Sequence, residues 1–288
     1  MAYQLIALDM DGTLLDSKKR VLPSSLDAIR RASDAGKAVA ISSGRCPAMV
    51  ALYKDDLPGV RYAICCAGAT IYDLEQDKTM FEQCLDPAFV DRALEVAEGL
   101  GFFLLEVTSG ANVYMQPDEV EHVEEVGVGA YAGLYRKTCT MVDDAHALAR
   151  ELRGNLSKLN FHFASVEARD RCRELLEGDD VVITNAERST MEFTARGIDK
   201  GQGVARLAQI LGIDNDQTIA VGDAENDRRC CGRRALAWRW ATPFPRPSPP
   251  RTCRWPTTTT TAWRRRFAAT CSRKERCRAW RPYALLAP

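Results

Sequence analysis

Tryptophan is missing from the first 227 residues of this 288-residue chain, and histidine occurs only three times in all. No apolar run is long enough to span a bilayer, and the amino-terminal residues have neither the basic flank nor the cleavage site of a signal peptide. The six cysteines before residue 228 show no metal-ligand spacing. We therefore expect a cytoplasmic protein without membrane contacts, whose thiols are small core or surface groups.

Acidic residues are almost absent from the last part of the chain, residues 228–288. This tail holds 16 Lys and Arg but a single acid, Glu275, together with all five tryptophans and eight of the 13 prolines. The whole chain has 39 basic and 39 acidic residues, so subtraction leaves 23 basic and 38 acidic residues before the tail. The net charge of zero is therefore the sum of −15 before the tail and +15 in the tail. The tail has no helical or strand period, and we expect it to be disordered.

The part before the tail alternates strand and helix patterns. Apolar runs at 5–8, 38–42 and 62–68 predict buried strands, and 48–56 predicts a short helix. Residues 23–37 predict a helix with Ser24 or Ser25 as its N-cap and Gly36 at its end. Strand, helix, strand, helix, strand indicates an α/β fold, a Rossmann-like doubly wound parallel sheet.

A second pattern interrupts the first. From about Asp86 the sequence predicts a helix, a hairpin, and then strand, helix and two strands, which is α+β in style. A helix and a strand at about 200–222 return to the first style. We therefore predict a core domain formed by 1–82 and 188–227, an inserted cap domain at 83–187, and the tail at 228–288.

The candidate chemistry begins where the first strand ends. Asp9 and Asp11 flank Met10, and Gly12 and Thr13 permit a tight turn beyond them. Two carboxylates at this spacing suit a site where one stays ionised near a divalent cation and the other exchanges a proton. A calcium loop is excluded because its glycine belongs at the sixth position, and here it is fourth.

Four motifs in order resemble those of the haloacid dehalogenase superfamily: "DMDGTLLD", "ISSGR", "GIDKG" and "GDAEND". Because the insertion falls between the second and third motifs and has a mixed α/β pattern, the chain is most similar to the Cof-type sugar phosphatases. The resemblance covers about residues 3–227. It implies a Mg²⁺-dependent phosphatase that hydrolyses small phosphate monoesters of the sugar-phosphate kind through an aspartyl-phosphate intermediate.

The resemblance also implies a role for each motif residue. Asp9 would be the nucleophile, Asp11 the general acid and base, and Ser43 and Lys200 the groups that bind the phosphoryl oxygens. Asp9, Asp11, Asp223 and Asp227 would hold or surround Mg²⁺, an all-oxygen set of the kind this cation prefers. The remaining substrate-binding candidates are Gly12, Gly44, Arg45 and Asn226, although Arg45 could equally pair with a surface carboxylate.

Two features fall outside this pattern. The third strand of such proteins usually ends in Asn-Gly, whereas here Ala67 precedes Gly68, so an amide expected near the substrate is missing. His122, His146 and His162 match no catalytic motif, and we interpret them as ordinary cap residues.

The abrupt tail has two interpretations. The tail can be translated back into codons and read again in a frame that begins on the third base of each codon. In this frame it is compatible with "LLRAAGLGVAMGNAFPEAK" and later "DNDHDGVAAAI". These segments resemble those that follow "GDAEND" in Cof-type proteins. This indicates a shift of reading frame at or beside Arg228, so the chain would be catalytically impaired or dead. Alternatively, a basic tail with interleaved tryptophan could bind nucleic acid. We favour the frameshift and expect a monomer or weak dimer whose partner is a small phosphorylated metabolite.

Overall fold

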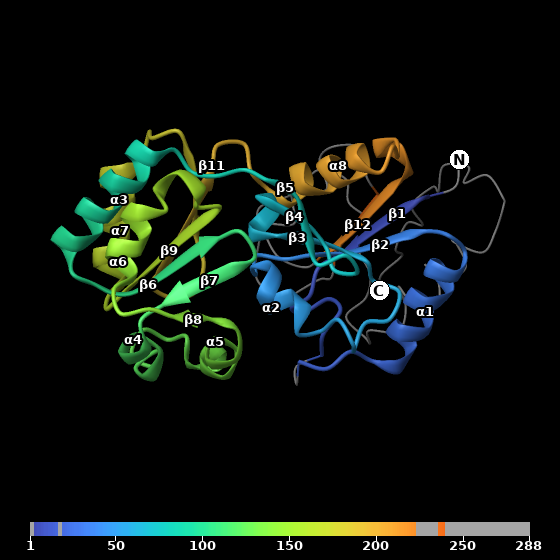
Figure 1. Ribbon diagram of the computed structural model, residues 1–288, viewed down its shortest axis with the longest axis horizontal. Helices are drawn as coiled ribbons and strands as arrows, with labels where there is room; N and C mark the ends of the chain where they lie inside the picture. The colour runs from blue at the N-terminus through green and yellow to red at the C-terminus, as the bar shows by residue number, and fades with distance from the viewer. Residues whose placement is uncertain (1–2, 17–18, 223–235, 240–288) are drawn as a thin grey trace, which may run out of the picture. The chain divides into compact units, whose positions relative to one another are not determined.

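The computed structural model describes residues 3–16 and 19–222, and the backbone of 236–239 (Figure 1). The chain divides into two compact units. The first draws on Met1–Ser42, Lys54–Tyr62 and Lys200–Pro288, and the second on Ser43–Tyr53 and Ala63–Asp199. Within the described residues, no helix is both long and apolar enough to cross a membrane.

The first unit contains parallel strands and their connecting helices, as the sequence predicts. The strand β1 lies between β2 and β12, parallel to both. The strands and helices of this unit are β1 (Leu5–Leu8), α1 (Pro23–Asp34), β2 (Ala38–Ser42), α8 (Lys200–Ile210), β12 (Thr218–Gly222) and β13 (Leu236–Arg239). This order, strand–helix–strand with parallel pairing, confirms the α/β class.

The predicted serine cap of α1 is wrong. The helix begins at Pro23 with Leu22 as its N-cap, and no side chain caps it. Proline at the first helical position lacks the N–H that a cap would satisfy and already has a helical φ, so the helix starts without a serine hydroxyl. The predicted end is right, because Gly36 has a φ of 70° directly after the helix.

The tail contributes one described element, which corrects the expectation that it has no strand. Leu236–Arg239 forms β13, parallel to β12, with Ala220 opposite Ala237 and Val221 opposite Trp238. The outer edge of β12 is therefore paired over four residues. The rest of 223–288 lies outside the described residues, so the expected disorder there is not described.

The second unit holds two groups of strands and the helices between them. The short elements nearest its start are α2 (Pro47–Ala51), most of β3 (Tyr62–Cys65), and the antiparallel pair β4 (Thr70–Asp73) and β5 (Lys78–Glu82). The helix predicted at 48–56 is shorter than expected, because turns replace it after Ala51 and place Leu57 in the interior.

A six-stranded sheet makes up most of the second unit, in the order β10-β11-β9-β6-β7-β8. Its strands are β6 (Phe102–Ser109), β7 (Asn112–Met115), β8 (Thr140–Met141), β9 (Lys158–Phe163), β10 (Val181–Asn185) and β11 (Thr190–Ala195). The sheet thus continues past residue 187, where we expected the cap to end. Figure 1 shows three helices against one face of this sheet, namely α3 (Pro87–Leu100), α6 (Ala145–Glu151) and α7 (Val166–Leu176).

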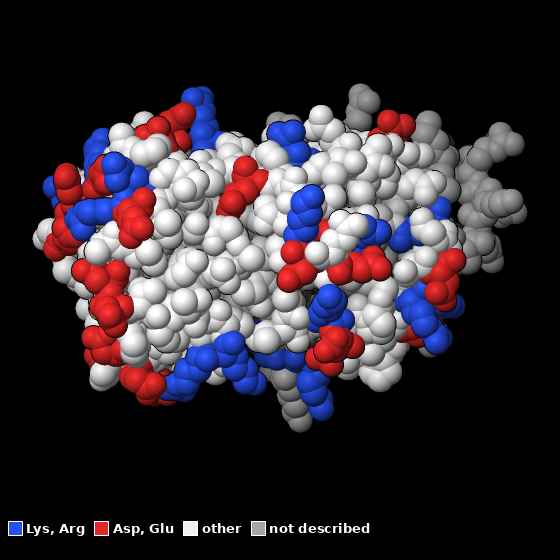
Figure 2. Space-filling view, in the orientation of Figure 1, with Lys and Arg blue, Asp and Glu red and all other residues white. Residues whose placement is uncertain are grey.

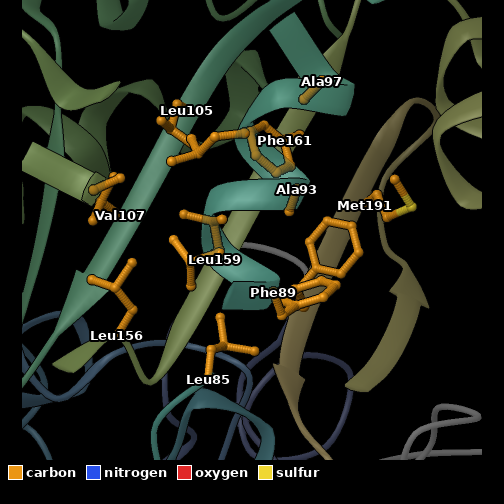
Figure 3. Close-up of a cluster of buried hydrophobic side chains, with 14 of the residues drawn as sticks. Leu85, Phe89, Ala93, Ala97, Leu105, Val107, Leu156, Leu159, Phe161 and Met191 are labelled. Atoms are coloured by element: carbon orange, nitrogen blue, oxygen red, sulfur yellow. The ribbon is translucent and has the colours of Figure 1, made fainter. Parts of the chain in front are cut away.

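The two faces of this sheet differ in chemistry because side chains alternate along a strand. Toward α3 lies an apolar cluster that includes Leu105, Leu159, Phe161 and Met191 (Figure 3). Phe193 belongs to the same cluster. The rings of Phe161 and Phe193 meet edge to face with centroids 5.9 Å apart.

The alternate positions of the same strands are polar, and nearly all of them are buried. They are Glu106 and Thr108 on β6, Lys158, Asn160 and His162 on β9, and Thr190, Glu192 and Thr194 on β11. Near this face lie α4 (Pro117–Glu121) and α5 (Ala132–Thr138). Tyr135 of α5 donates a hydrogen bond from its hydroxyl to Glu106. Buried polar groups must find partners inside the protein, and this face provides them as a network.

Candidate active site

The first unit places Asp9 at the carboxyl end of β1, where the apolar run stops. Its main-chain N–H donates to the carbonyl oxygen of Val221, which extends the pairing between β1 and β12 by one residue. The Asp9 side chain is 8% exposed and accepts a hydrogen bond from Lys200 Nζ at 2.6 Å, although the two residues are 191 positions apart. Lys200 is the first residue of α8 and is also buried. The structure therefore brings together two of the predicted site residues as a buried ion pair.

The loop after Asp9 is a tight turn that holds the other predicted groups of the first motif. Gly12 has a φ of 78°, a conformation that side chains with a Cβ rarely adopt, so glycine is required there. The main-chain N–H of Leu14 donates to the carbonyl oxygens of Asp9 and Met10, which closes the turn. Asp11 is more exposed and pairs with Lys19, a residue that we did not predict for the site.

Ser43, Gly44 and Arg45 belong to the second unit, where they form the loop after β2. The three carbonyl oxygens of this loop all accept hydrogen bonds. Those of Ser43 and Arg45 accept from the main-chain N–H groups of Ala67 and Cys66, at 3.0 and 2.9 Å. The carbonyl oxygen of Gly44 accepts from Lys158 Nζ at 3.1 Å. The Ser43 hydroxyl is itself turned back onto the loop, where it accepts from the main-chain N–H of Arg45.

Arg45 contacts the side chain of Tyr53 within the second unit. Its guanidinium donates to the Tyr53 hydroxyl at 3.3 Å and stacks 5.6 Å from the centre of the same ring. These contacts do not distinguish between the two roles left open for Arg45, a substrate contact and a surface ion pair, so both stay predictions.

The segment that clamps this loop is itself strained. Cys66 and Ala67 have φ values of 50° and 55°, and Gly68 comes next at 112°. Two successive non-glycine residues in the left-handed region are rare, and each costs on the order of 1 kcal/mol. The asparagine that is usual before this glycine tolerates the conformation better than alanine does. The departure at Ala67 is therefore a backbone matter as well as the loss of an amide.

A buried polar network extends from this loop across the six-stranded sheet. Glu106 accepts hydrogen bonds from Tyr135, Asn160 and His162, the last at 2.6 Å. Burial alone would raise the pKa of Glu106, but the hydrogen bond and charge of His162, with Lys158 and Tyr135, outweigh burial and lower the pKa. The histidine that we took for an ordinary residue is thus a central member of the network.

Lys158 is the cation of this network. Its Nζ lies 2.6 Å from Glu192 Oε1, and the residue is almost completely buried. Burial acts to lower the pKa of Lys158, but the nearby carboxylates of Glu192 and Glu106 outweigh it and raise the pKa, so the amine is charged. Our sequence reasoning missed Lys158. The alternation of polar and apolar residues in "KLNFHF" was the signal, because it gives the strand a polar face.

The remaining predicted residues are Asp223, Asn226 and Asp227, and they lie outside the described residues. The described chain reaches Gly222, the last residue of β12, which runs beside β1. Among the residues that are described, no group of three His, Cys, Asp or Glu side chains could hold a metal ion. Of the oxygen donors that the sequence predicts for a metal ion, Asp9 and Asp11 lie within the described residues.

Comparison with known proteins gives this arrangement a family. A model of haloacid dehalogenase-like hydrolases matches residues 6–229. Phosphatase YwpJ of Bacillus subtilis is 26% identical over 244 residues, which cover 78% of this chain and 85% of that protein. Pyridoxal phosphate phosphatase YbhA of Escherichia coli is 42% identical over 100 residues, 35% of this chain and 36% of its own.

Solved structures agree on the fold. The subclass IIB sugar phosphatase BT4131 superposes with a TM-score of 0.68 at 18% identity, and the match covers 82% of this chain and 87% of that one. The resemblance to Cof-type proteins drawn from the four motifs is confirmed. The chain belongs to the haloacid dehalogenase-like hydrolases, as a Cof-type phosphoric monoester hydrolase.

Proposed function

We propose that this protein hydrolyses small phosphate monoesters through a covalent intermediate on Asp9. The observation that carries the proposal is the buried pair of Asp9 and Lys200 at the end of β1. A carboxylate removed from water is costly unless it is paired, and the ammonium of Lys200 compensates its charge. The same ammonium can stabilise the negative charge that builds up on a phosphoryl group during transfer.

In the first step a carboxylate oxygen of Asp9 attacks phosphorus opposite the ester oxygen. The new Asp9–phosphorus bond forms as the bond to the ester oxygen breaks, and Asp11 donates a proton to the departing alcohol. Lys200 and the Ser43 hydroxyl bind the phosphoryl oxygens during the transfer. In this role the Ser43 hydroxyl donates its O–H to the phosphoryl group. It either gives up the hydrogen bond that it now accepts from the main-chain N–H of Arg45 or keeps that bond while it donates.

In the second step the intermediate is hydrolysed. Asp11, now a carboxylate, takes a proton from a water molecule, whose oxygen attacks the same phosphorus atom. The Asp9–phosphorus bond breaks and inorganic phosphate leaves, so both carboxyl groups return to their starting forms. Asp11 is well placed for proton exchange because it is only partly buried, whereas Asp9 is shielded from water.

The donors available fit a magnesium ion. Asp9, the main-chain carbonyl of Asp11, and Asp223 with Asp227 would supply oxygen only, which suits a hard cation that keeps several waters. When bound, the ion would neutralise charge between the Asp9 carboxylate and the phosphate. Asp223 directly follows β12, and Asp9 directly follows the adjacent β1, which supports their shared role.

We further propose that the substrate is a phosphorylated sugar or a molecule of similar size. Two of the chain's relatives are phosphatases of pyridoxal phosphate and of sugar phosphates, and such compounds present hydroxyl groups or a polar ring beside the phosphate. The same proposal includes the domain division into 1–82, 83–187, 188–227 and 228–288, with the end of the cap moved from residue 187 to the end of β11. It also includes a cytoplasmic location and a monomeric or weakly dimeric state.

We also propose that the reading frame shifts at or beside Arg228. The match to the family model ends at residue 229, which supports a break at this point. The alternative function, nucleic-acid binding, would depend on the basic residues of 228–288, which lie outside the described residues. On the face shown in Figure 2, Lys and Arg are interspersed with Asp and Glu, which does not favour a basic binding surface there.

The test is hydrolysis of p-nitrophenyl phosphate by the present chain and by a frame-restored version, with and without Mg²⁺. We expect Mg²⁺-dependent turnover that falls at least ~1,000-fold in Asp9→Asn, because the amide cannot act as the nucleophile. Lys200→Met should lower the turnover strongly as well. Equal rates in the frame-restored protein, its Asp9→Asn variant and a metal-free sample would exclude the proposed mechanism.

A further inference from the structure

The loop of Ser43, Gly44 and Arg45 is fixed by two different kinds of contact. Main-chain N–H groups of Ala67 and Cys66 hold its outer two carbonyl oxygens, and these donors come from the adjacent strained segment. The middle carbonyl oxygen, that of Gly44, is held by the side chain of Lys158. A single lysine thus supplies the bond that the backbone does not.

This lysine is costly to keep where it is. A buried ammonium is tolerated only when its charge and its N–H groups are matched, and replacing such a group by an apolar side chain of similar size is often neutral for stability. Glu192 matches the charge of Lys158 from the neighbouring strand β11, at 2.6 Å. The contact with Gly44 gives this ion pair a role that burial and charge compensation do not by themselves require.

We propose that Lys158 is a positioning residue for the phosphate-binding loop, oriented by Glu192 and acting on Ser43 through the carbonyl of Gly44. The inference depends on the proposed function, because it assumes that Ser43 binds the phosphoryl group. Lys158 itself touches neither the substrate nor the reacting atoms in this role. Its ammonium fixes the plane of the Gly44 peptide and thereby the direction in which the Ser43 hydroxyl points.

The test compares the protein with a double variant, Lys158→Met with Glu192→Gln. The pair is replaced together so that neither charge is left buried and unpaired, which keeps the variant folded. We expect the main-chain amides of Cys66 and Ala67, which hold the same loop, to exchange hydrogen at least about tenfold faster, as followed by mass spectrometry. This readout needs no catalytic activity.

The second readout is steady-state hydrolysis of p-nitrophenyl phosphate in the frame-restored protein. We expect kcat to fall about tenfold to 100-fold, because a displacement of ~1 Å costs about that much, while KM changes less than about threefold. Lys37→Met is the matched control, since Lys37 is also partly buried but donates only to Gln4 among the bonds recorded for its side chain. It should change neither amide exchange at 66–67 nor kcat.

The two claims fail separately. Unchanged amide exchange at Cys66 and Ala67 in a folded double variant overturns the role of Lys158, whatever the activity. A loss of kcat equal to the loss of folded protein also overturns it, because that pattern indicates a purely structural role. Absence of turnover in the unmodified frame-restored protein contradicts the proposed function, and the exchange measurement then still decides whether Lys158 holds the loop.

Discussion

At the scale of single residues, substitution of Gly44 can distinguish an effect on activity from an effect on stability. Its φ is outside the left-handed region, and a Cβ added to it would meet no heavy atom within 4 Å. Gly44→Ala should therefore leave the free energy of unfolding unchanged or raise it by ~0.5 kcal/mol, since alanine has less freedom in the unfolded chain. If the space beside Gly44 admits the phosphate, however, the methyl group should lower kcat/KM at least tenfold.

Gly59 is the control for this prediction. It has a φ of 91°, and a Cβ there would lie 3.0 Å from Ser33 Cβ, so Gly59→Ala should destabilise the protein by more than ~1 kcal/mol. Activity per folded molecule should not change. Urea unfolding and initial rates measure both quantities, and full activity in Gly44→Ala would show that the space next to Gly44 is not used by the substrate.

Ala67 offers a residue-scale prediction of the opposite sign. With a φ of 55° it bears a strain that asparagine relieves, because the short polar side chain can hydrogen-bond to its own backbone. Ala67→Asn should raise the free energy of unfolding by about 0.5–1 kcal/mol in urea titrations. Ala67→Val at the same position should lower it, and a stabilised valine variant would contradict the assignment of strain.

At the scale of elements, α4 carries a carboxyl group whose ionisation opposes folding. Burial raises the pKa of Glu119 to about 7, despite the main-chain hydrogen bond that its carboxylate accepts from Gln116. A carboxyl whose pKa is higher in the folded than in the unfolded state contributes stability at low pH. That contribution is lost as the pH rises from about 4.5 through about 7.

Glu119→Gln should therefore stabilise the protein at pH 8, by up to ~2 kcal/mol, and clearly less at pH 5, where the carboxyl is still protonated in the folded state and only partly ionised in the unfolded state. Glutamine has the shape of the protonated acid and keeps an oxygen for the Gln116 N–H. Unfolding in urea at the two pH values measures the difference between variant and parent. An equal gain at both values would mean that ionisation of Glu119 is not the cause.

The sequence predicted the elements whose period is clear and missed those whose pattern is short. The strands before Asp9 and at "KLNFHF" follow from their apolar positions, and so does α3. The β4–β5 hairpin and the helices α4, α5 and α6 were not predicted, because they are short and, unlike the equally short runs of β1 and β2, mix polar with apolar residues without a clear period.

The candidate site divides in the same way. Asp9, Ser43 and Lys200 could be named from motifs because each follows or begins a predicted element. That Lys200 reaches Asp9 across 191 residues, or that Lys158 reaches Gly44, depends on tertiary packing, for which no local pattern exists. The family resemblance assigned Asp9 and Lys200 to one site without their direct contact, and it gave no indication of Lys158.

At the scale of the whole molecule, the present chain should be less stable and less active than its frame-restored counterpart. β13 pairs with β12 over four residues, which protects part of the outer edge of β12. The proposed frame change nevertheless replaces the sequence soon after Gly222, close to two of the expected magnesium ligands. We expect a melting temperature at least ~5 °C lower and far less Mg²⁺-dependent turnover.

Calorimetry and p-nitrophenyl phosphate hydrolysis on the two proteins measure these differences. A third protein that ends at residue 229 separates the effects of a wrong tail from those of a missing one. If the present chain has the same melting temperature and the same specific activity as the frame-restored protein, the residues after 229 support the site equally well in either frame.

Because the two faces of β6, β9 and β11 differ in chemistry, it matters whether an odd or an even number of codons is gained or lost within these strands. Loss of one codon within β9 would turn the polar residues on one side of the deletion toward Phe193 and its apolar neighbours, and would bring aromatic rings among the carboxylates. Loss of two codons would keep every side chain on its own face at the cost of a shorter strand. Over evolutionary time these three strands should therefore lengthen or shorten by pairs of residues, while single-codon changes collect in the hairpin at Gly110 and similar turns.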